Sequence, residues 1–113
     1  MSRHSFRTQH DSQNVDVILG WDRPLQEFFL QVRAPDSVDE ETMGFLYSDL
    51  DDPHARCRDL SYFSSVLTGL GIAVPAQMLT AVSEDSRVNR GNFVVEHEQD
   101  GTCRVLYDDP IKP

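Results

Sequence analysis

The chain has 113 residues, of which 39% are hydrophobic and 26% charged, with a formal net charge of −9 at pH 7. This length and composition are typical of one folded domain spanning residues 1–113 and exclude a disordered chain. No apolar run approaches the roughly 18 residues that a transmembrane helix needs. The excess of carboxylates also disfavours direct binding to nucleic acid, because phosphate binding depends on Lys and Arg.

The negative charge is concentrated in the last two-thirds of the chain. Residues 1–33 carry four Arg and four Asp or Glu, so the whole net charge of −9 lies in residues 34–113. Two cysteines, Cys57 and Cys103, are too few for a disulfide framework, and the first seven residues lack the apolar run of a secretory signal. We therefore expect a cytoplasmic protein with free thiols and no membrane association.

Residues 14–33 predict two β-strands around a tight turn. Apolar side chains alternate with period two from Val15 to Trp21, and the same pattern returns from Phe28 to Val32. Pro24 suits the second position of a type I turn between them. The segment therefore indicates a hairpin with one strongly apolar face.

Shorter elements flank this hairpin. A first strand is expected over residues 4–9, after a loose end at residues 1–3. An acidic exposed loop over residues 34–42 leads to a strand over residues 43–48. Pro53 then suits the first position of a helix, because it needs no backbone donor there.

The strongest helix begins after Asp59, whose carboxylate can accept from a free amide of the first turn. Gly69 and Gly71 favour its end. One apolar stripe runs along it, formed by Leu60, Phe63, Leu67 and Leu70. We expect this stripe to pack against Val15, Val17, Leu19 and Trp21.

A second helix and a hairpin complete the chain. Pro75 opens the helix, whose narrow stripe of Met78, Leu79 and Val82 fades at Glu84 and Asp85. Residues 93–97 and 103–107 predict two strands around the Asp100-Gly101 turn, and residues 108–113 are expected to be loose. The pattern predicts a single α+β domain with an antiparallel sheet, a four-strand N-terminal part plus a C-terminal hairpin, and two helices on one face.

Several residue groups have the types that catalytic or metal sites use. Asp49, Asp51 and Asp52 offer oxygen ligands beside His54, but the segment lacks the glycine and final glutamate of an EF-hand loop. His54 and Cys57 would share a helix face if a helix began at Pro53.

With Cys103, this pair is a candidate zinc site, and alone it is a candidate catalytic pair. Neither has a second close ligand pair or an oxyanion hole. We predict no cofactor, no metal and no catalysis. His97 is interpreted as a satisfied or edge-exposed strand residue.

The string Gly20-Trp21-Asp22-Arg23-Pro24-Leu25, followed by Phe28-Phe29-Leu30, resembles small bacterial proteins without an established function. Residues 46–51, 70–75 and 89–95 are similar to stretches of the same group. The resemblance covers residues from about 14 to 96. It implies an α+β fold and a bacterial origin, and it carries no activity or site residues.

We expect a non-catalytic protein-binding module, with a protein partner or a second copy in a homodimer. Its candidate partner surface combines acidic residues with two apolar residues of the second sheet face: Asp36, Asp39, Glu40, Glu41, Asp49, Asp51, Asp52, Ile18 and Phe29. One alternative is an acidic decoy from a phage or mobile element. In that alternative these acids, with Asp59, imitate nucleic acid and occupy a basic channel. The other alternative is a small enzyme or ligand-binding protein with a cleft at Trp21, His54, Cys57 and Tyr62, rimmed by the acids of residues 49–52.

Overall fold

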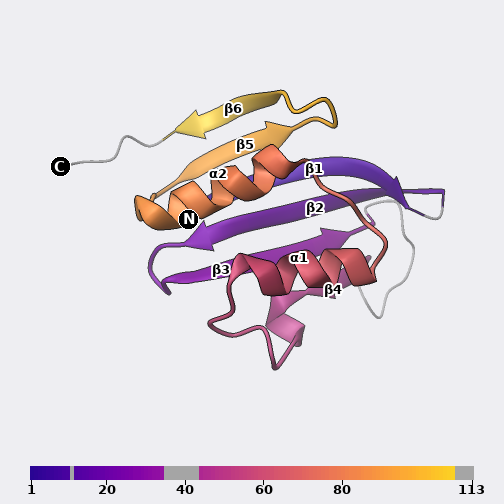
Figure 1. Ribbon diagram of the computed structural model, residues 1–113, viewed down its shortest axis with the longest axis horizontal. Helices are drawn as coiled ribbons and strands as arrows, with labels where there is room; N and C mark the ends of the chain where they lie inside the picture. Colours follow the sequence, from indigo (N-terminus) through magenta and orange to yellow (C-terminus); the bar gives the residue numbers. More distant parts are fainter. Residues whose placement is uncertain (11, 35–43, 109–113) are drawn as a thin grey trace.

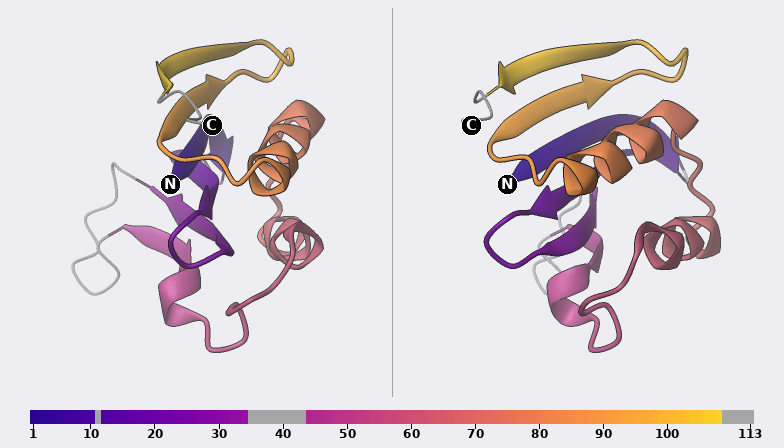
Figure 2. Two further views of the ribbon diagram at one scale, coloured as in Figure 1. Left: turned by 90° about the vertical axis from the view of Figure 1, so that its left-hand side faces the viewer. Right: turned by 60° about the vertical axis from the view of Figure 1, so that its left-hand side comes forward.

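A mixed β-sheet with helices on one face forms the framework of the molecule. The computed structural model describes residues 1–10, 12–34 and 44–108. Six strands follow the order β4-β3-β2-β1-β5-β6 across the sheet. The helices α1 and α2 lie on the same face of it (Figure 1; Figure 2). The predicted α+β class is confirmed.

The first four strands form an antiparallel array, as the sequence predicts. They are β1 (Ser2–His10), β2 (Gln13–Asp22), β3 (Glu27–Arg33) and β4 (Phe45–Ser48). The turn between β2 and β3 is closed by the amide of Gln26, which donates to the carbonyl of Arg23 over 3.3 Å. The predicted loop over residues 34–42 lies almost entirely outside the described residues.

The start of β1 corrects the expected loose end at residues 1–3. Ser2 and Arg3 pair with Phe93 and Val94 of β5, and Ser2 is fully buried. The sequence does not indicate a strand here, because Ser2 and Arg3 are polar and their strand partners lie about 90 residues away in the chain. The first strand is therefore two residues longer at its N-terminus than predicted.

The C-terminal hairpin joins the sheet through a parallel pair. It consists of β5 (Phe93–His97) and β6 (Cys103–Asp108), and β5 runs parallel to β1. The expectation of an antiparallel sheet holds for four of the five strand pairs. The exception arises because α1 and α2 carry the chain from β4 across one face of the sheet to the free side of β1, where β5 runs opposite to β4 and therefore parallel to β1. Asp108 belongs to β6, and the rest of the expected loose tail lies outside the described residues.

Helix α1 (Leu60–Gly69) begins and ends as predicted. The carboxylate of Asp59 accepts from the amide of Tyr62 over 3.1 Å. At the other end Gly71 has φ +77°, and the amide of Ile72 donates to the carbonyl of Leu67 over 2.9 Å. Glycine suits this position because it adopts a left-handed conformation without a steric cost.

Helix α2 (Ala76–Arg87) is longer than its apolar stripe suggests. The prediction that the helix fades at Glu84 and Asp85 is wrong, because the helix continues to Arg87. Asp85 lies one turn beyond Val82 on the buried face and is only 2% exposed. From the sequence alone, an acid at an apolar position of the stripe indicates that the helix ends. Here the acid is buried because it pairs with His4 on β1, which the sequence does not reveal.

The segment after β4 also differs from the prediction. A 3-10 turn, η1 (Asp49–Asp51), replaces the helix expected to begin at Pro53, and the chain stays non-helical until α1. The hydroxyl of Ser48 accepts from the amide of Leu50 and begins this turn. His54 and Cys57 therefore share no helix face.

The core lies between the sheet and the two helices. Every second residue of β2 faces it, from Val15 to Trp21, and each of these residues is at most 6% exposed. In α1, Phe63 and Leu67 are buried, whereas Leu60 and Leu70 pack at the edge of the core. Helix α1 lies mainly over β3, whereas α2 lies over β2 and β1, so the prediction that the α1 stripe packs against β2 is wrong, although all these elements share one core. No helix in the described part of the chain is long and apolar enough to cross a membrane.

Candidate functional site

A cleft of about 450 Å³ lies where the sheet meets the segment that follows β4. Apolar side chains, among them Phe28, Phe29 and Leu50, form part of its wall. Its four carboxylates are those of Asp22, Glu27, Asp49 and Asp52. Arg3 and Arg56 also line it, so acids outnumber basic side chains there. The cleft is thus an acidic site with partly apolar walls.

Two of the carboxylates are brought together by the β2–β3 turn. Asp22 ends β2 and Glu27 begins β3, and the two residues are directly opposite in the sheet. Like charges in this position are unfavourable. Glu27 is partly compensated, because Oε1 accepts from the amide of Cys57 over 3.2 Å and lies 3.7 Å from Nε of Arg56.

Asp49 is the least satisfied of the four acids. Its Oδ1 is buried and has no hydrogen-bond partner among the described residues. Burial raises the pKa of its carboxyl above the ordinary range; hydrogen bonds from the backbone of Asp49 and Leu30 oppose this rise, and the nearby charges of Glu27 and Asp22 add to it. Because Oδ1 is buried, the Asp49 carboxyl would have to turn toward the cleft before Oδ1 could accept a hydrogen bond from a bound molecule.

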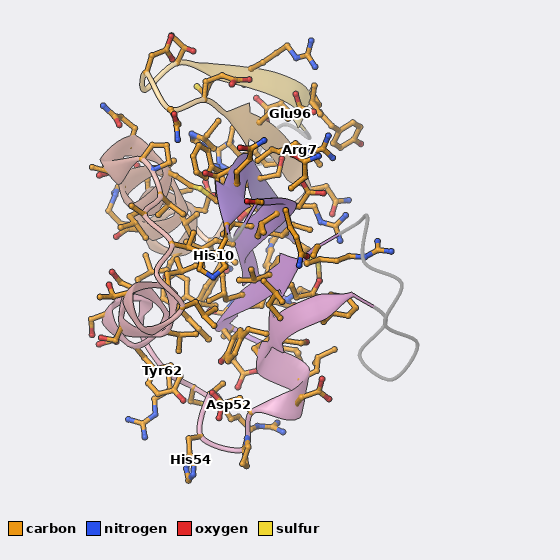
Figure 3. The ribbon with its side chains drawn as sticks, turned by 90° about the vertical axis from the view of Figure 1, so that its right-hand side faces the viewer. Arg7, His10, Asp52, His54, Tyr62 and Glu96 are labelled. Carbon is orange, nitrogen blue, oxygen red and sulfur yellow. The ribbon has the colours of Figure 1, made fainter. Side chains whose placement is uncertain are left out.

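Asp52 has the opposite role and ties two elements together. Its Oδ2 accepts from the hydroxyl of Tyr62 in α1 over 2.6 Å and from that of Tyr47 in β4 over 2.8 Å. These hydrogen bonds, and one from the amide of His54, lower the pKa of the Asp52 carboxyl. Figure 3 shows Asp52 and Tyr62 directed toward each other, with His54 projecting away from the molecule. Asp52 therefore holds one wall of the cleft in place.

The structure does not form the candidate sites built on His54 and Cys57. Cys57 lies in a loop with φ +58°, and its thiol donates to Glu27 over 3.1 Å, which raises the pKa of the thiol. A protonated thiol is a poor nucleophile. Cys103 lies on β6, at the opposite edge of the sheet from β4. Among the described residues no group of three His, Cys, Asp or Glu side chains is arranged to hold a metal ion.

The cleft itself differs from the one expected at Trp21, His54, Cys57 and Tyr62. Asp49 and Asp52 line it, but none of those four residues does. Trp21 faces the helices instead and donates from Nε1 to Asn89 over 3.1 Å. The alternation of β2 already places Trp21 with Val15 and Leu19, on the face that the helices cover.

The described residues of the candidate partner surface are distributed over two cavities and η1. Ile18 and Phe29 lie on the uncovered sheet face and are each half-buried. Phe29 lines the acidic cleft, whereas Ile18 lines a second cavity of about 420 Å³ with Arg7 and Glu96. Arg7 and Glu96 lie at the far end of the molecule from Asp52 (Figure 3). Of the acids, Asp51 is exposed on η1, and Asp36, Asp39, Glu40 and Glu41 lie outside the described residues.

A buried polar cluster connects α2 with β1 and β5. His4 Nε2 lies 2.6 Å from Oδ2 of Asp85, and His4 Nδ1 lies 2.8 Å from Nε2 of His97. Arg90 completes the cluster, with Nε 3.1 Å from Oδ1 of Asp85. Burial lowers the pKa of His97 to about 4, and the neighbouring His4 adds to this effect. His97 is therefore buried, and the edge-exposed alternative for it is wrong.

Sequence reasoning missed Asp22 and Glu27 as site residues, and it missed the cluster of His4, Asp85 and His97. A signal existed for each. The two acids flank a tight turn and are directly opposite. His4 shares the inward face of β1 with Phe6, and His97 shares the inward face of β5 with Val95, in strands whose side chains alternate between the two faces. Buried polar residues in such positions need partners.

Comparison with known proteins adds no match: no protein-family model, no curated protein and no solved structure is similar to the chain. The resemblance to small bacterial proteins therefore stays a prediction.

Proposed function

We propose that the chain is a non-catalytic protein-binding module that receives a basic side chain of its partner in the acidic cleft. The observation that carries this proposal is Asp49, whose buried Oδ1 lacks a donor beside a cleft with three further carboxylates. A cationic donor would satisfy this oxygen and also neutralise the opposed pair of Asp22 and Glu27.

Arginine fits the cleft better than lysine. Its planar guanidinium can bind two carboxylates at once, and its stem packs on apolar surface. The cleft offers both features, because its acids stand beside Phe28, Phe29 and Leu50. A phosphate group would be repelled by the same acids, so the proposed partner is a protein and not a nucleic acid. Both cysteines are exposed and free, which suits a reducing compartment such as the cytoplasm.

The tripeptides Gly-Arg-Gly, Gly-Lys-Gly and Gly-Glu-Gly provide a direct test. We would titrate each into isotopically labelled protein and follow the amide and carboxyl NMR signals of Asp22, Glu27 and Asp49. We expect shifts with the arginine peptide, weaker shifts with the lysine peptide and none with the glutamate peptide. Added salt should weaken the response, because the attraction is electrostatic.

Asp49→Asn and Asp51→Asn form a matched pair for this titration. Both remove one negative charge from η1, but only Asp49 lines the cleft. Asp49→Asn should weaken the arginine response severalfold, whereas Asp51→Asn should leave it nearly unchanged. The proposal fails if the arginine peptide causes no shifts in the cleft, or if both variants weaken binding equally.

A further inference from the structure

Strand β6 is an outer strand of the sheet with an unusually apolar surface. It has β5 on one side and no described strand on the other. All six of its residues are exposed, and three consecutive apolar side chains are about half exposed: Val105 52%, Leu106 49% and Tyr107 53%. The outer backbone groups of such a strand can pair with another strand, and this apolar run does nothing to prevent it.

A β-bulge determines which side chains of β6 share a face. Arg104 is opposite Glu96, and Tyr107 is opposite Val94, with a register shift between them. Glu96 and Val94 are two residues apart and therefore point to the same face of the sheet. Arg104 and Tyr107, three residues apart, consequently lie on that same face.

We propose that β6 pairs antiparallel with β6 of a second copy of the chain, about a two-fold axis between Val105 and Leu106. In this register Arg104 of each copy is opposite Tyr107 of the other, on the same face. A guanidinium beside an aromatic ring is a favourable cross-strand pair. Val105 is opposite Leu106 of the other copy, so the apolar centre of the strand is covered.

The order of residues on β6 selects a second copy in this orientation. A parallel arrangement in register would place Arg104 opposite Arg104, with like charges in contact. The antiparallel arrangement is self-complementary, as a two-fold interface requires. It does not involve the acidic cleft, because no residue that lines the cleft belongs to β5 or β6. The inference is therefore independent of the proposed function.

Light scattering after size exclusion, over a series of protein concentrations, tests the pairing. We expect the mass to rise from one chain to two with increasing concentration. Leu106→Lys should abolish this rise, because two lysines would meet near the two-fold axis. Leu46→Lys is the matched control, since Leu46 is 44% exposed on β4, the other outer strand, and its change should leave the dimer intact.

The register is tested separately through Cys103, which is exposed on β6. A spin label on Cys103, in a Cys57→Ser background, should report a distance between the two copies of about 14 Å, because Cys103 and the position opposite it, Asp108, pair with His97 and Phe93, which are four residues of strand apart. A parallel pair would bring the two labels into direct contact.

Three outcomes would overturn the proposal. One is a strict monomer up to millimolar concentration, including a monomer that binds an unrelated extended peptide along β6 instead. Another is a dimer that Leu46→Lys disrupts and Leu106→Lys does not. The third is a label separation that matches the parallel arrangement. Circular dichroism of each variant confirms that it is folded, so that a lost dimer is not a lost fold.

Discussion

His97 is a residue whose protonation depends on the tertiary structure. In an unfolded chain its pKa lies near 6.5. In the folded protein burial lowers this pKa to about 4, and Nε2 faces His4 across 2.8 Å. The ring is thus neutral at pH 7. As the pH falls, the unfolded chain gains stability by binding a proton at His97 that the buried ring does not bind.

The stability of the protein should therefore fall between pH 6.5 and pH 4. In this range the unfolded chain binds a proton at His97 that the folded chain does not, so the free energy of unfolding decreases as the pH falls. One such group contributes a slope of up to about 1.4 kcal/mol per pH unit. Urea unfolding at stepped pH measures it. His97→Gln should remove this part of the slope, whereas His54→Gln, at an exposed position, should keep it.

Gly20 is required for a steric reason. A Cβ at this position would collide with the backbone oxygen of Ser2 and lie 2.5 Å from the ring of Phe29. The oxygen belongs to a buried strand and cannot move cheaply. We expect Gly20→Ala to lower the free energy of unfolding by about 1–3 kcal/mol.

Gly69→Ala is the counterpart of that substitution. No atom lies within 4 Å of a Cβ added at Gly69, which is the last residue of α1. Alanine is the better helix former by up to about 1 kcal/mol, so this change should be neutral or stabilising. In thermal melts, Gly20→Ala should lower the melting temperature, whereas Gly69→Ala should leave it unchanged or raise it. Equal shifts would contradict the steric argument.

At the scale of elements, α1 is held in place by its apolar stripe, by a cap at its start and by one hydrogen bond to the segment before it. Asp59 caps the helix, and Tyr62 donates to Asp52 in the loop before it. Phe63 and Leu67 are buried in the core, where α1 lies over β3. The same helix therefore contributes to the core and positions one wall of the acidic cleft.

Truncation of Leu67 measures the core contribution of α1. Leu67 is 2% exposed, so Leu67→Ala should cost about 2–5 kcal/mol of stability, and Leu67→Asp should prevent folding. Leu50→Ala is the control, because Leu50 is 82% exposed and its loss should change stability by no more than about 0.5 kcal/mol. Chemical denaturation compares them. A Leu67→Ala variant as stable as the native chain would refute the packing of α1 on the sheet.

At the scale of the molecule, one parallel strand pair joins two antiparallel parts. Strands β1 to β4 form one part and the hairpin β5–β6 the other, connected by β1 and β5. The same junction is bridged on the helix side by Asp85, His4 and His97. Strands β1 and β2 are central and carry the most deeply buried residues, whereas β6 is exposed throughout.

Hydrogen exchange should follow this arrangement. At concentrations where the chain is monomeric, amides of β1 and β2 should exchange slowest and those of β6 fastest, because local opening is easiest at an exposed edge. Raising the concentration should protect β6 selectively if the copies pair there. Uniform protection across all six strands would indicate that the molecule opens only as a whole.

Much of the fold could be predicted because its signals are local. The period-two pattern of Val15 to Trp21, the cap at Asp59 and the positive-φ glycine at Gly71 act between neighbours in the chain. The hairpins, both helices and the α+β class follow from such features. Local patterns also identified Asp49 and Asp52 as chemically notable acids.

Only the tertiary structure decided which distant residues meet. The parallel pairing of β1 with β5 and the cluster of His4 with Asp85 join residues more than 80 positions apart. The acidic cleft likewise forms only when the segment after β4 reaches the β2–β3 turn, leaving Oδ1 of Asp49 without a described partner and Trp21 on the opposite face. The physical reason is that side-chain periodicity determines which face a residue occupies. The chain crossover determines what that face meets.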